Sequence, residues 1–325
     1  MVVRKVWAGQ DHAPACILPR MIKPTYACIR QFAEFVELKD FRPNTKLEYV
    51  RYLRKCAEHF QCDPSTLSED QVREYFLFLR QHKHYGGSSM NVAKVTLRTF
   101  FQDCLKIAAG WTVFKDLQIR RPEPLPFVLS RADVCAVLNA VREPRFRSCL
   151  RLIYHCGLRV GEAVLIEVRD IDGQGGRIHI RNGKGGKDRY VPLGEAMLEE
   201  LRAWWRTHRN QEWLFPSPGR GWKDRSRTLS ETMRRATAPM SVGSIQLTFR
   251  LARERTGIKT VATIHTLRHS WATHMLEEGA NIRELSSYLG HESLDTTAIY
   301  LHLTAVSAEK TKRALAALHT AVTPH

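Results

Sequence analysis

Apolar residues in the first third of the chain recur at the three- and four-residue spacing of amphipathic helices. This spacing predicts four helices, over residues 25–39, 44–60, 67–81 and 88–108. Ser68 precedes two acidic residues and is placed to cap the third helix, and a glycine pair at 86–87 precedes the fourth. The pattern predicts an all-α domain over residues 24–112, after an arm at residues 1–23 that shows no clear periodicity.

A proline-rich segment separates this domain from the rest of the chain. Residues 117–131, LQIRRPEPLPFVLSR, carry three closely spaced prolines, which prevent a regular helix. We therefore predict an extended linker over residues 113–129. Ser130 and Asp133 then have the spacing of a capping box, which opens a second domain over residues 130–325.

The second domain mixes helical spacing with a short stretch of alternation. Residues 146–157 and 161–168 are predicted helices, with Gly157 as a stop between them. Over residues 177–193 apolar and polar positions alternate on both sides of GKGGK, which predicts a β-hairpin. Helical spacing then returns, interrupted by an arginine-rich loop at 216–241 that either touches DNA or a partner, or is a surface insertion. The expected fold is mainly α with a small β-hairpin, an α+β domain behind an all-α domain.

The charge balance adds a class of partner to this fold. The chain has 50 Lys and Arg against 33 Asp and Glu, a net charge of +17. Such a surplus favours nucleic acid, because phosphates release counterions when basic side chains neutralise them. Candidates for DNA contact lie on the second helix and in the linker: Lys46, Arg51, Arg54, Lys55, Arg120 and Arg121. A solvated basic face is the alternative for the helix residues.

Cysteine usage and hydropathy indicate where the protein works. The eight cysteines form no CxxC pair, so we expect free thiols in a reducing compartment and no zinc site. No apolar run reaches the roughly 18 residues of a membrane span, and the first 20 residues lack the apolar core of a signal peptide. The expected location is the cytoplasm, with no membrane partner.

The stretch HTLRHSWATHMLEEGANIRELSSYLGHESLDTTAIY, residues 265–300, concentrates residues suited to chemistry. Its first histidine and its arginine are three positions apart, so they share one face of a helix. Gly279 and Gly290 are placed to end successive helices. Three helices separated by two tight stops fold back on one another, which brings together His265, Arg268, His291 and Tyr300.

Two further basic residues are available to this cluster. Arg159 lies in GLRVGE just after the predicted stop, and Lys184 lies in the hairpin tip. Ser293 or Thr296 is expected to cap the helix that carries Tyr300. Guanidinium groups suit phosphate oxygens, and a positioned phenol is a competent oxygen nucleophile. The set suits phosphoryl transfer on a phosphodiester without a metal.

Each motif alone has a simpler interpretation. HTLRH is an ordinary capped helix start, GLRVGE is a turn closed by an Arg–Glu pair, and GKGGK is a basic hairpin tip. GKGGK lacks the form of a Walker A loop. The ordered set Arg, Lys, His-x-x-Arg, His, Tyr is far more specific than any of its members.

These motifs resemble the tyrosine recombinase, or phage integrase, superfamily, close to its Xer-like bacterial branch. The resemblance rests on CGLRVGEAVLIEV, NGKGGKDRYVPLG, the stretch from residue 265 to LHL at 303, and the N-terminal helices, over roughly residues 25 to 310. Two positions depart from the family pattern: Gly161 stands where serine is common, and Ser286 stands near a frequent glutamine.

The resemblance implies the roles of the site residues. Tyr300 would attack the scissile phosphate, giving a 3′-phosphotyrosine link and a free 5′-hydroxyl. Arg159 and Arg268 would bind the non-bridging oxygens, and Lys184 would protonate the leaving 5′-oxygen.

The remaining members of the set would assist. His265 would act in acid–base work on the tyrosine proton, His291 would bind the phosphate, and Glu162 would support the site. Because the covalent link conserves bond energy, the resemblance implies no ATP, metal or other cofactor.

The resemblance also implies partners. The two domains would form a clamp around double-stranded DNA with paired inverted binding sites, in the bacterial cytoplasm and on the nucleoid when DNA-bound. Four protomers would assemble in the synaptic complex, as a homotetramer or with a related recombinase. The amphipathic segment AEKTKRALAALH, residues 308–319, would dock on a neighbour or on its own chain. The alternatives are type IB topoisomerase activity and a catalytically silent DNA-binding regulator.

Overall fold

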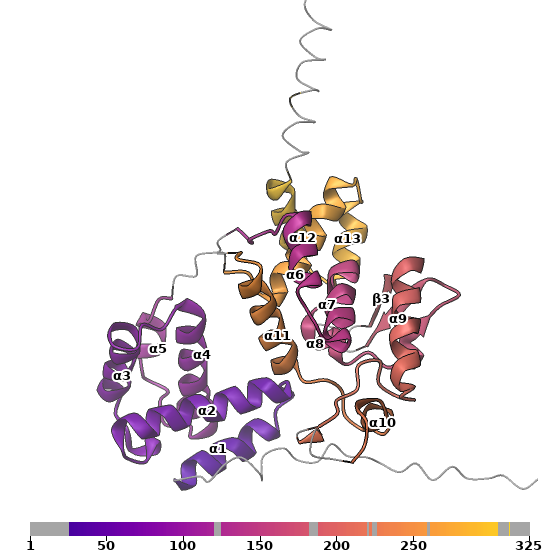
Figure 1. Ribbon diagram of the computed structural model, residues 1–325. Helices are drawn as coiled ribbons and strands as arrows, with labels where there is room; N and C mark the ends of the chain where they lie inside the picture. The colour runs from indigo at the N-terminus through magenta and orange to yellow at the C-terminus, as the bar shows by residue number, and fades with distance from the viewer. Residues whose placement is uncertain are drawn as a thin grey trace, which may run out of the picture. The chain divides into compact units, whose positions relative to one another are not determined.

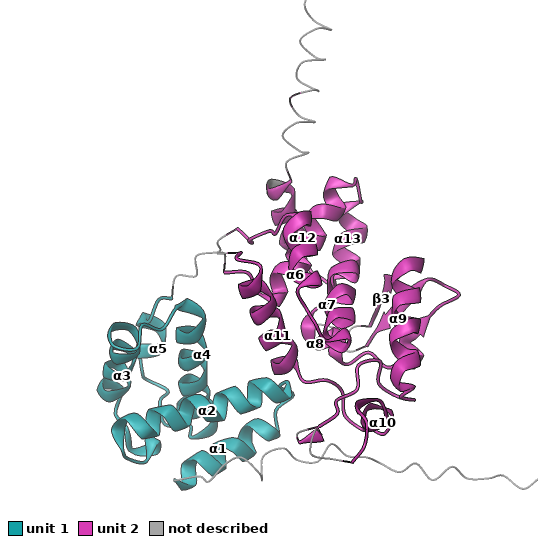
Figure 2. Ribbon diagram, viewed as in Figure 1, with its two compact units in different colours: residues 1–123 teal, residues 124–325 magenta. Residues whose placement is uncertain are grey.

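The structure is a computed structural model that describes residues 26–119, 125–181, 188–219, 221–222, 226–258, 261–304 and 312 (Figure 1). The chain divides into two compact units, residues 1–123 and 124–325 (Figure 2). In the described ranges, no helix combines the length and apolar character needed to cross a membrane. The cysteines in these ranges are all free thiols.

The first unit is all helical, as the sequence predicts. Its elements are α1 (Ala27–Glu37), α2 (Pro43–Phe60), η2 (Pro64–Thr66), α3 (Glu69–Gln81), α4 (Gly87–Arg98), the π-helix η3 (Thr99–Cys104) and α5 (Val113–Asp116). The predicted fourth helix therefore ends as a π-helix, and residues assigned to the linker form α5. Val113 and Phe114 of α5 are buried in the core of this unit.

Aromatic packing in the core and a capping box at α3 stabilise the first unit. Phe32 and Phe100 are fully buried, and their rings meet edge to face with centroids 5.4 Å apart. Ser68 caps α3 as predicted, because its Oγ accepts from the Gln71 N–H while the Gln71 side chain returns to the Ser68 N–H.

The second unit is mainly helical around a small sheet, which confirms the predicted fold class. Its helices are α6 (Arg131–Asn139), α7 (Pro144–Cys156), α8 (Val160–Val164), η4 (Val168–Asp170), α9 (Glu195–His208), α10 (Leu229–Arg234), α11 (Val242–Arg255), α12 (Ile264–Glu277), α13 (Ile282–Leu289), α14 (Asp295–Ala298) and η7 (Ile299–Leu303). The prediction of a continuous loop over residues 216–241 is wrong, because Thr228 and Glu231 form a capping box that starts α10 inside it.

The sheet contains the predicted hairpin and one additional strand. Strands β1 (Ile171–Asp172), β2 (Arg177–Ile180) and β3 (Arg189–Pro192) pair antiparallel in sequence order. Ile178 of β2 lies opposite Val191 of β3, and both side chains are fully buried. The alternation in the sequence therefore marks the face that packs on the core.

The helix ends of the second unit follow their glycines and caps, with one difference. Ser130 caps α6, because its Oγ accepts from the Asp133 N–H. The Asp133 carboxylate accepts from the Ser130 hydroxyl and not from the Ser130 backbone N–H, so the second bond of the predicted capping box is not formed. Gly157 ends α7 with a φ of 60°. A side-chain carbon at Gly157 would lie 2.1 Å from the ring of Trp271, so glycine also permits α7 and α12 to approach.

His208, the last residue of α9, is fully buried beside Trp204, with ring centroids 4.8 Å apart. Its Nδ1 accepts a hydrogen bond from the Asn210 N–H at 3.1 Å, which requires a neutral ring. Burial lowers the pKa of His208 to about 4. The folded state therefore resists protonation at this residue.

Acidification from pH 6.5 to pH 4 is expected to destabilise the protein. The folded pKa of His208 lies below the unfolded value near 6.5, so the unfolded state binds more protons in this window and unfolding becomes easier as pH falls. The contribution is roughly 3 kcal/mol over the window. Urea unfolding at several pH values measures it, and His208→Gln, which stays neutral, should flatten the slope. An unchanged slope in that variant would contradict the assignment.

Candidate active site

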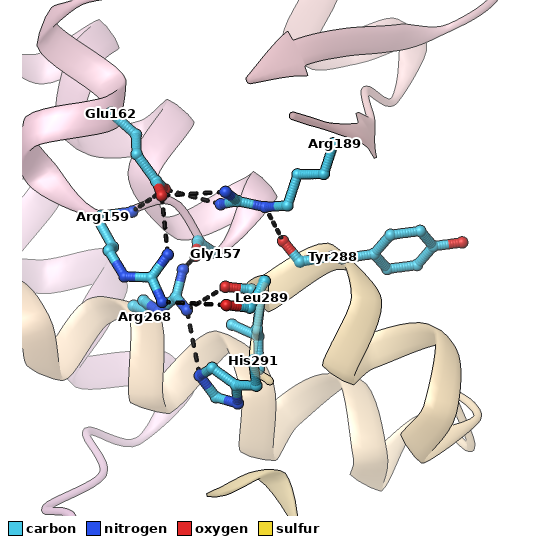
Figure 3. A network of polar contacts seen from close by, with 9 residues as sticks. Gly157, Arg159, Glu162, Arg189, Arg268, Tyr288, Leu289 and His291 are labelled. Carbon is cyan, nitrogen blue, oxygen red and sulfur yellow. Dashed lines mark hydrogen bonds and ion pairs between the residues drawn. The ribbon is translucent and has the colours of Figure 1, made fainter. Parts of the chain in front are cut away.

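Segments far apart in the sequence supply the polar network in Figure 3. Arg159 is the N-cap residue of α8, directly after the turn that ends α7, and Arg268 lies in α12. His291 follows the end of α13, and Arg189 begins β3. The fold thus brings these three predicted site residues and the predicted supporting residue Glu162 together with Arg189, which the motifs do not single out.

Arg268 is 3% exposed and is held by backbone groups. Its Nη1 donates to the carbonyl oxygen of Gly157 at 2.7 Å. Its Nη2 donates to the carbonyl oxygen of Leu289 at 2.5 Å and to Nε2 of His291 at 3.2 Å. Burial and then the charge of Arg159 lower the pKa of Arg268 to about 9. The guanidinium is thus oriented, still protonated at neutral pH, and held mainly by neutral partners.

Glu162 is the carboxylate that fixes two arginines. Its Oε1 accepts from Arg159 Nη1 at 2.8 Å, and its Oε2 accepts from the backbone N–H of Arg159 at 2.9 Å. Arg189 binds both carboxylate oxygens, with nitrogen–oxygen distances of 3.0 and 2.7 Å. Burial alone raises the pKa of Glu162, but the hydrogen bonds and charge of Arg189, with those of Arg159, lower it to about 2. The ionised carboxylate fixes the direction of Arg159.

Arg189 is a site residue that the sequence analysis misses. Its side chain is only 9% exposed. The available signal was strand alternation, because Arg189 shares the face of β3 that carries the buried Val191. An arginine on a buried face needs a carboxylate partner, which here is Glu162.

The C-terminal end of α13 forms a common anchor for the arginines. Three successive carbonyl oxygens accept from three arginines: Tyr288 from Arg189 Nε at 2.7 Å, Leu289 from Arg268, and Gly290 from Arg159 Nη2 at 3.4 Å (Figure 3). A helix C-terminus carries partial negative charge and so stabilises these cations. Gly290 has a φ of 62°, and a side-chain carbon there would lie 3.2 Å from Arg189, so glycine suits the position twice.

The network has more positive than negative charge. Within its described residues the network has three guanidinium groups and one carboxylate, that of Glu162, which pairs with Arg159 and Arg189 but not with Arg268. Buried cations without full compensation favour the binding of an anion. Arginine is the side chain whose forked donors match a phosphate group. The geometry therefore suits a phosphodiester, whose charge would complete the balance.

His291 adjoins the network with a defined protonation pattern. Because Arg268 only donates, Nε2 of His291 accepts, so a neutral ring carries its proton on Nδ1. Nδ1 lies 2.8 Å from Oγ1 of Thr297 in α14 and donates to it. Ser293, one of the two predicted caps, accepts from the N–H of Asp295 at 3.1 Å, although the N-cap position itself is Leu294.

Tyr300 lies in η7, which continues α14, and its side chain is 3% exposed. Its hydroxyl lies 2.8 Å from Nδ1 of His269. Burial raises the pKa of Tyr300, and the charges of Arg268 and Arg159 oppose this shift. The phenol is therefore protonated in the resting protein and lies within the electrostatic reach of the arginines.

His265 and His269 are one helical turn apart on α12, with ring centroids 6.4 Å apart. Burial, followed by the charges of Arg268 and Arg159, lowers the pKa of His265. The structure describes both His265 and Tyr300, and these two residues form no hydrogen bond with each other. His269 is not among the site residues predicted from the sequence, although the i, i+4 spacing within HTLRH places it on the same helix face as His265.

The remaining predicted residues have mixed outcomes. Outside the described residues lie Arg120, Arg121 and Lys184. The four helix candidates for DNA contact lie on α2. Lys46 and Arg51 pair with acidic side chains, and Lys55 donates to the hydroxyl of Tyr85 at 3.0 Å. Nε and Nη2 of Arg54 are buried and have no hydrogen-bond partner among the described residues. DNA contact by these residues stays a prediction.

Comparison with known proteins gives the same picture. Residues 128–306 match the model of the phage integrase family, and residues 29–111 match that of the phage integrase N-terminal SAM-like domain. The putative integrase/recombinase y4qK of Sinorhizobium fredii is 34% identical over 275 residues, which cover 84% of this chain and 83% of that protein. The tyrosine recombinase XerA of Pyrococcus horikoshii is 30% identical over 278 residues, covering 85% and 89%.

Solved structures share the fold. Lambda integrase has been solved as a dimer on a COC′ core site, with a TM-score of 0.63 and 18% identity over 84% of this chain and 93% of that one. Its tetramer on a Holliday junction also gives 0.63, with 17% identity over 84% and 76%. The similarity of sequence over both units, and the match over more than half of the chain, confirm the resemblance seen in the motifs. The chain belongs to the phage integrase family of tyrosine recombinases.

Proposed function

We propose that this site-specific DNA recombinase cleaves and rejoins strands with Tyr300 as nucleophile, through a 3′-phosphotyrosine intermediate. The observation that carries the proposal is the position of the buried Tyr300, which lies in one apolar cluster with Leu289, whose carbonyl oxygen binds Arg268. Arg268 forms a cluster of arginines with Arg159 and Arg189, which share the Glu162 carboxylate. Such a cluster binds a phosphodiester and stabilises the charge that develops as the tyrosine attacks.

The contacts suggest how the work is divided. Arg159 and Arg268 bind the non-bridging oxygens, because both guanidinium groups are fixed in direction. Glu162 holds Arg159, and two backbone carbonyl oxygens hold Arg268. Binding of the phosphate by His291 rests on the family resemblance, and it requires Nε2 to gain a proton, because this nitrogen accepts from Arg268 in the resting protein while Nδ1 donates to Thr297. Lys184 protonates the leaving 5′-oxygen, a role that rests on the family resemblance alone. Neither ATP nor a metal ion enters this scheme, since the phosphotyrosine link conserves the bond energy.

The partner is double-stranded DNA with paired inverted sites, bound by both units of the chain on the nucleoid in the cytoplasm. The basic surplus of the chain supports a polyanionic partner. Four protomers assemble in the synaptic complex, by analogy with the lambda integrase tetramer. The segment at 308–319, for which docking on a neighbour and docking on its own chain are both open, lies outside the described residues apart from residue 312.

A nicked suicide duplex tests the proposal. The duplex is taken from DNA flanking the gene, where inverted repeats surround a spacer of about 6 to 8 base pairs, within one helical turn. The wild-type protein should form a covalent adduct in the presence of EDTA, and mass spectrometry should place the DNA on the peptide containing Tyr300. Binding without an adduct would indicate a silent regulator, and relaxation of supercoils without strand exchange would indicate a type IB topoisomerase.

A further inference from the structure

The hydroxyl of Tyr300 already has a hydrogen-bond partner, and it is not the expected histidine. Nδ1 of His269 lies 2.8 Å from the phenol oxygen, and the two rings are tilted by 44° with centroids 5.7 Å apart. His265, to which the family resemblance assigns work on the tyrosine proton, lies one turn away on the same helix. The phenol oxygen of Tyr300, which must lose its proton, is therefore hydrogen-bonded to His269.

The direction of this hydrogen bond follows from the protonation states. Burial, followed by His265 and then Arg268, lowers the pKa of His269 to about 4, so its ring is neutral at pH 7. The pKa of Tyr300 is raised, so its hydroxyl keeps its proton. With the ring proton on Nε2, Nδ1 is the acceptor and the phenol is the donor.

We propose that His269 accepts the proton of Tyr300 during DNA cleavage, and so acts as a catalytic residue. The inference rests on the proposed function. In the step, the Tyr300 O–H bond breaks, its proton moves to Nδ1 of His269, and the phenol oxygen forms a bond to phosphorus. The bond from phosphorus to the 5′-oxygen breaks, and that oxygen takes its own proton from Lys184 or water. When the strand is rejoined, His269 returns the proton to Tyr300.

The surroundings of His269 explain why the transfer waits for DNA. In the free protein, burial and the positive charge of Arg268 both destabilise the protonated form of this ring. A phosphodiester bound by the arginines adds one negative charge, and a second develops on the oxygens in the transition state. These charges offset the arginines, so His269 becomes a better base only when the substrate is in place.

Two substitutions separate proton transfer from positioning. His269→Gln keeps a side chain that can accept the Tyr300 hydrogen bond but cannot take a proton, and His269→Ala removes both functions. We expect both variants to bind the suicide duplex as the wild type does and to cleave it at least about 100-fold more slowly. Added imidazole should partly restore cleavage by His269→Ala. The matched control is His274→Gln. His274 lies on the same helix as His269 and also pairs with a tyrosine hydroxyl, that of Tyr154, at 2.9 Å.

A second substrate identifies which proton is affected. A duplex with sulfur in place of the bridging 5′-oxygen has a leaving atom that needs no proton. Cleavage of this duplex should stay slow for the His269 variants and recover for Lys184→Ala. Wild-type cleavage by His269→Gln would overturn the inference, because the side chain would then only position Tyr300. Recovery of the His269 variants with sulfur would also overturn it, whereas absence of a Tyr300 adduct in the wild type would overturn the proposed function itself.

Discussion

Replacing Tyr300 with phenylalanine is expected to abolish the covalent protein–DNA adduct while leaving DNA binding intact. The substitution removes one oxygen from a side chain that is 3% exposed, and that oxygen is the proposed nucleophile. The ring stays in its apolar cluster with residues of α12 and α13, so the fold should be preserved. We expect cleavage of the suicide duplex to fall below detection on a denaturing gel, with an unchanged gel-shift affinity.

Tyr154→Phe is the matched control for this experiment. Tyr154 also loses a hydroxyl that pairs with a histidine of α12, His274, at a nearly equal distance of 2.9 Å. Both variants therefore lose one hydroxyl–imidazole hydrogen bond, at a cost of about 1 kcal/mol. Only the Tyr300 variant should lose the adduct. An adduct that survives in Tyr300→Phe would show that another residue is the nucleophile.

Replacing Arg268 with lysine is expected to slow cleavage by about 100- to 1000-fold, in spite of the conserved charge. The guanidinium of Arg268 spans the carbonyl oxygens of Gly157 and Leu289 and also reaches His291. A single ammonium cannot hold both carbonyls and still direct a donor at phosphate. Single-turnover cleavage of the suicide duplex measures the loss, which should appear in the rate more than in the affinity.

This substitution also has a stability cost that must be measured separately. A carbonyl oxygen left unpaired in the core costs about 1–3 kcal/mol, which urea unfolding of Arg268→Lys would detect. The matched control is Arg202→Lys, because Arg202 is exposed on α9 and pairs only with Glu199 on the same helix. That variant should match the wild type in rate and stability. A cleavage rate for Arg268→Lys within about threefold of the wild type would contradict the role given to Arg268.

Elements with a strong local signal are predictable from the sequence. Ser68 and Ser130 cap helices in the structure, and Gly157 and Gly290 end helices in the left-handed conformation, because caps and stops depend on a few neighbouring residues. The hairpin follows from alternation at Ile178 and its neighbours. By contrast, β1 has two residues and α5 has four, which is too short for a period to be recognised.

The contacts of the candidate site depend on tertiary structure and are not visible in the same way. The motifs named Arg159 and Arg268, but residue types do not show that backbone carbonyl oxygens at the end of α13 hold these arginines. Arg189 and His269 lie inside the quoted stretches NGKGGKDRYVPLG and HTLRH, and only their contacts distinguish them from other polar residues there. Partners of this kind are decided by how distant segments approach, which one sequence without its fold does not reveal.

The anchoring of the arginines by the end of α13 has a consequence for biosynthesis. The bonds that complete the network join residues 131, 111 and 99 positions apart. Closing such long loops costs conformational entropy before the contacts repay it, so these bonds are expected late in folding. A chain still on the ribosome carries Arg159 and Glu162 long before Gly290 and Tyr300 have been made. With Tyr300 as the proposed nucleophile, we expect that the nascent enzyme cannot nick DNA until residue 300 has been translated and the network has folded.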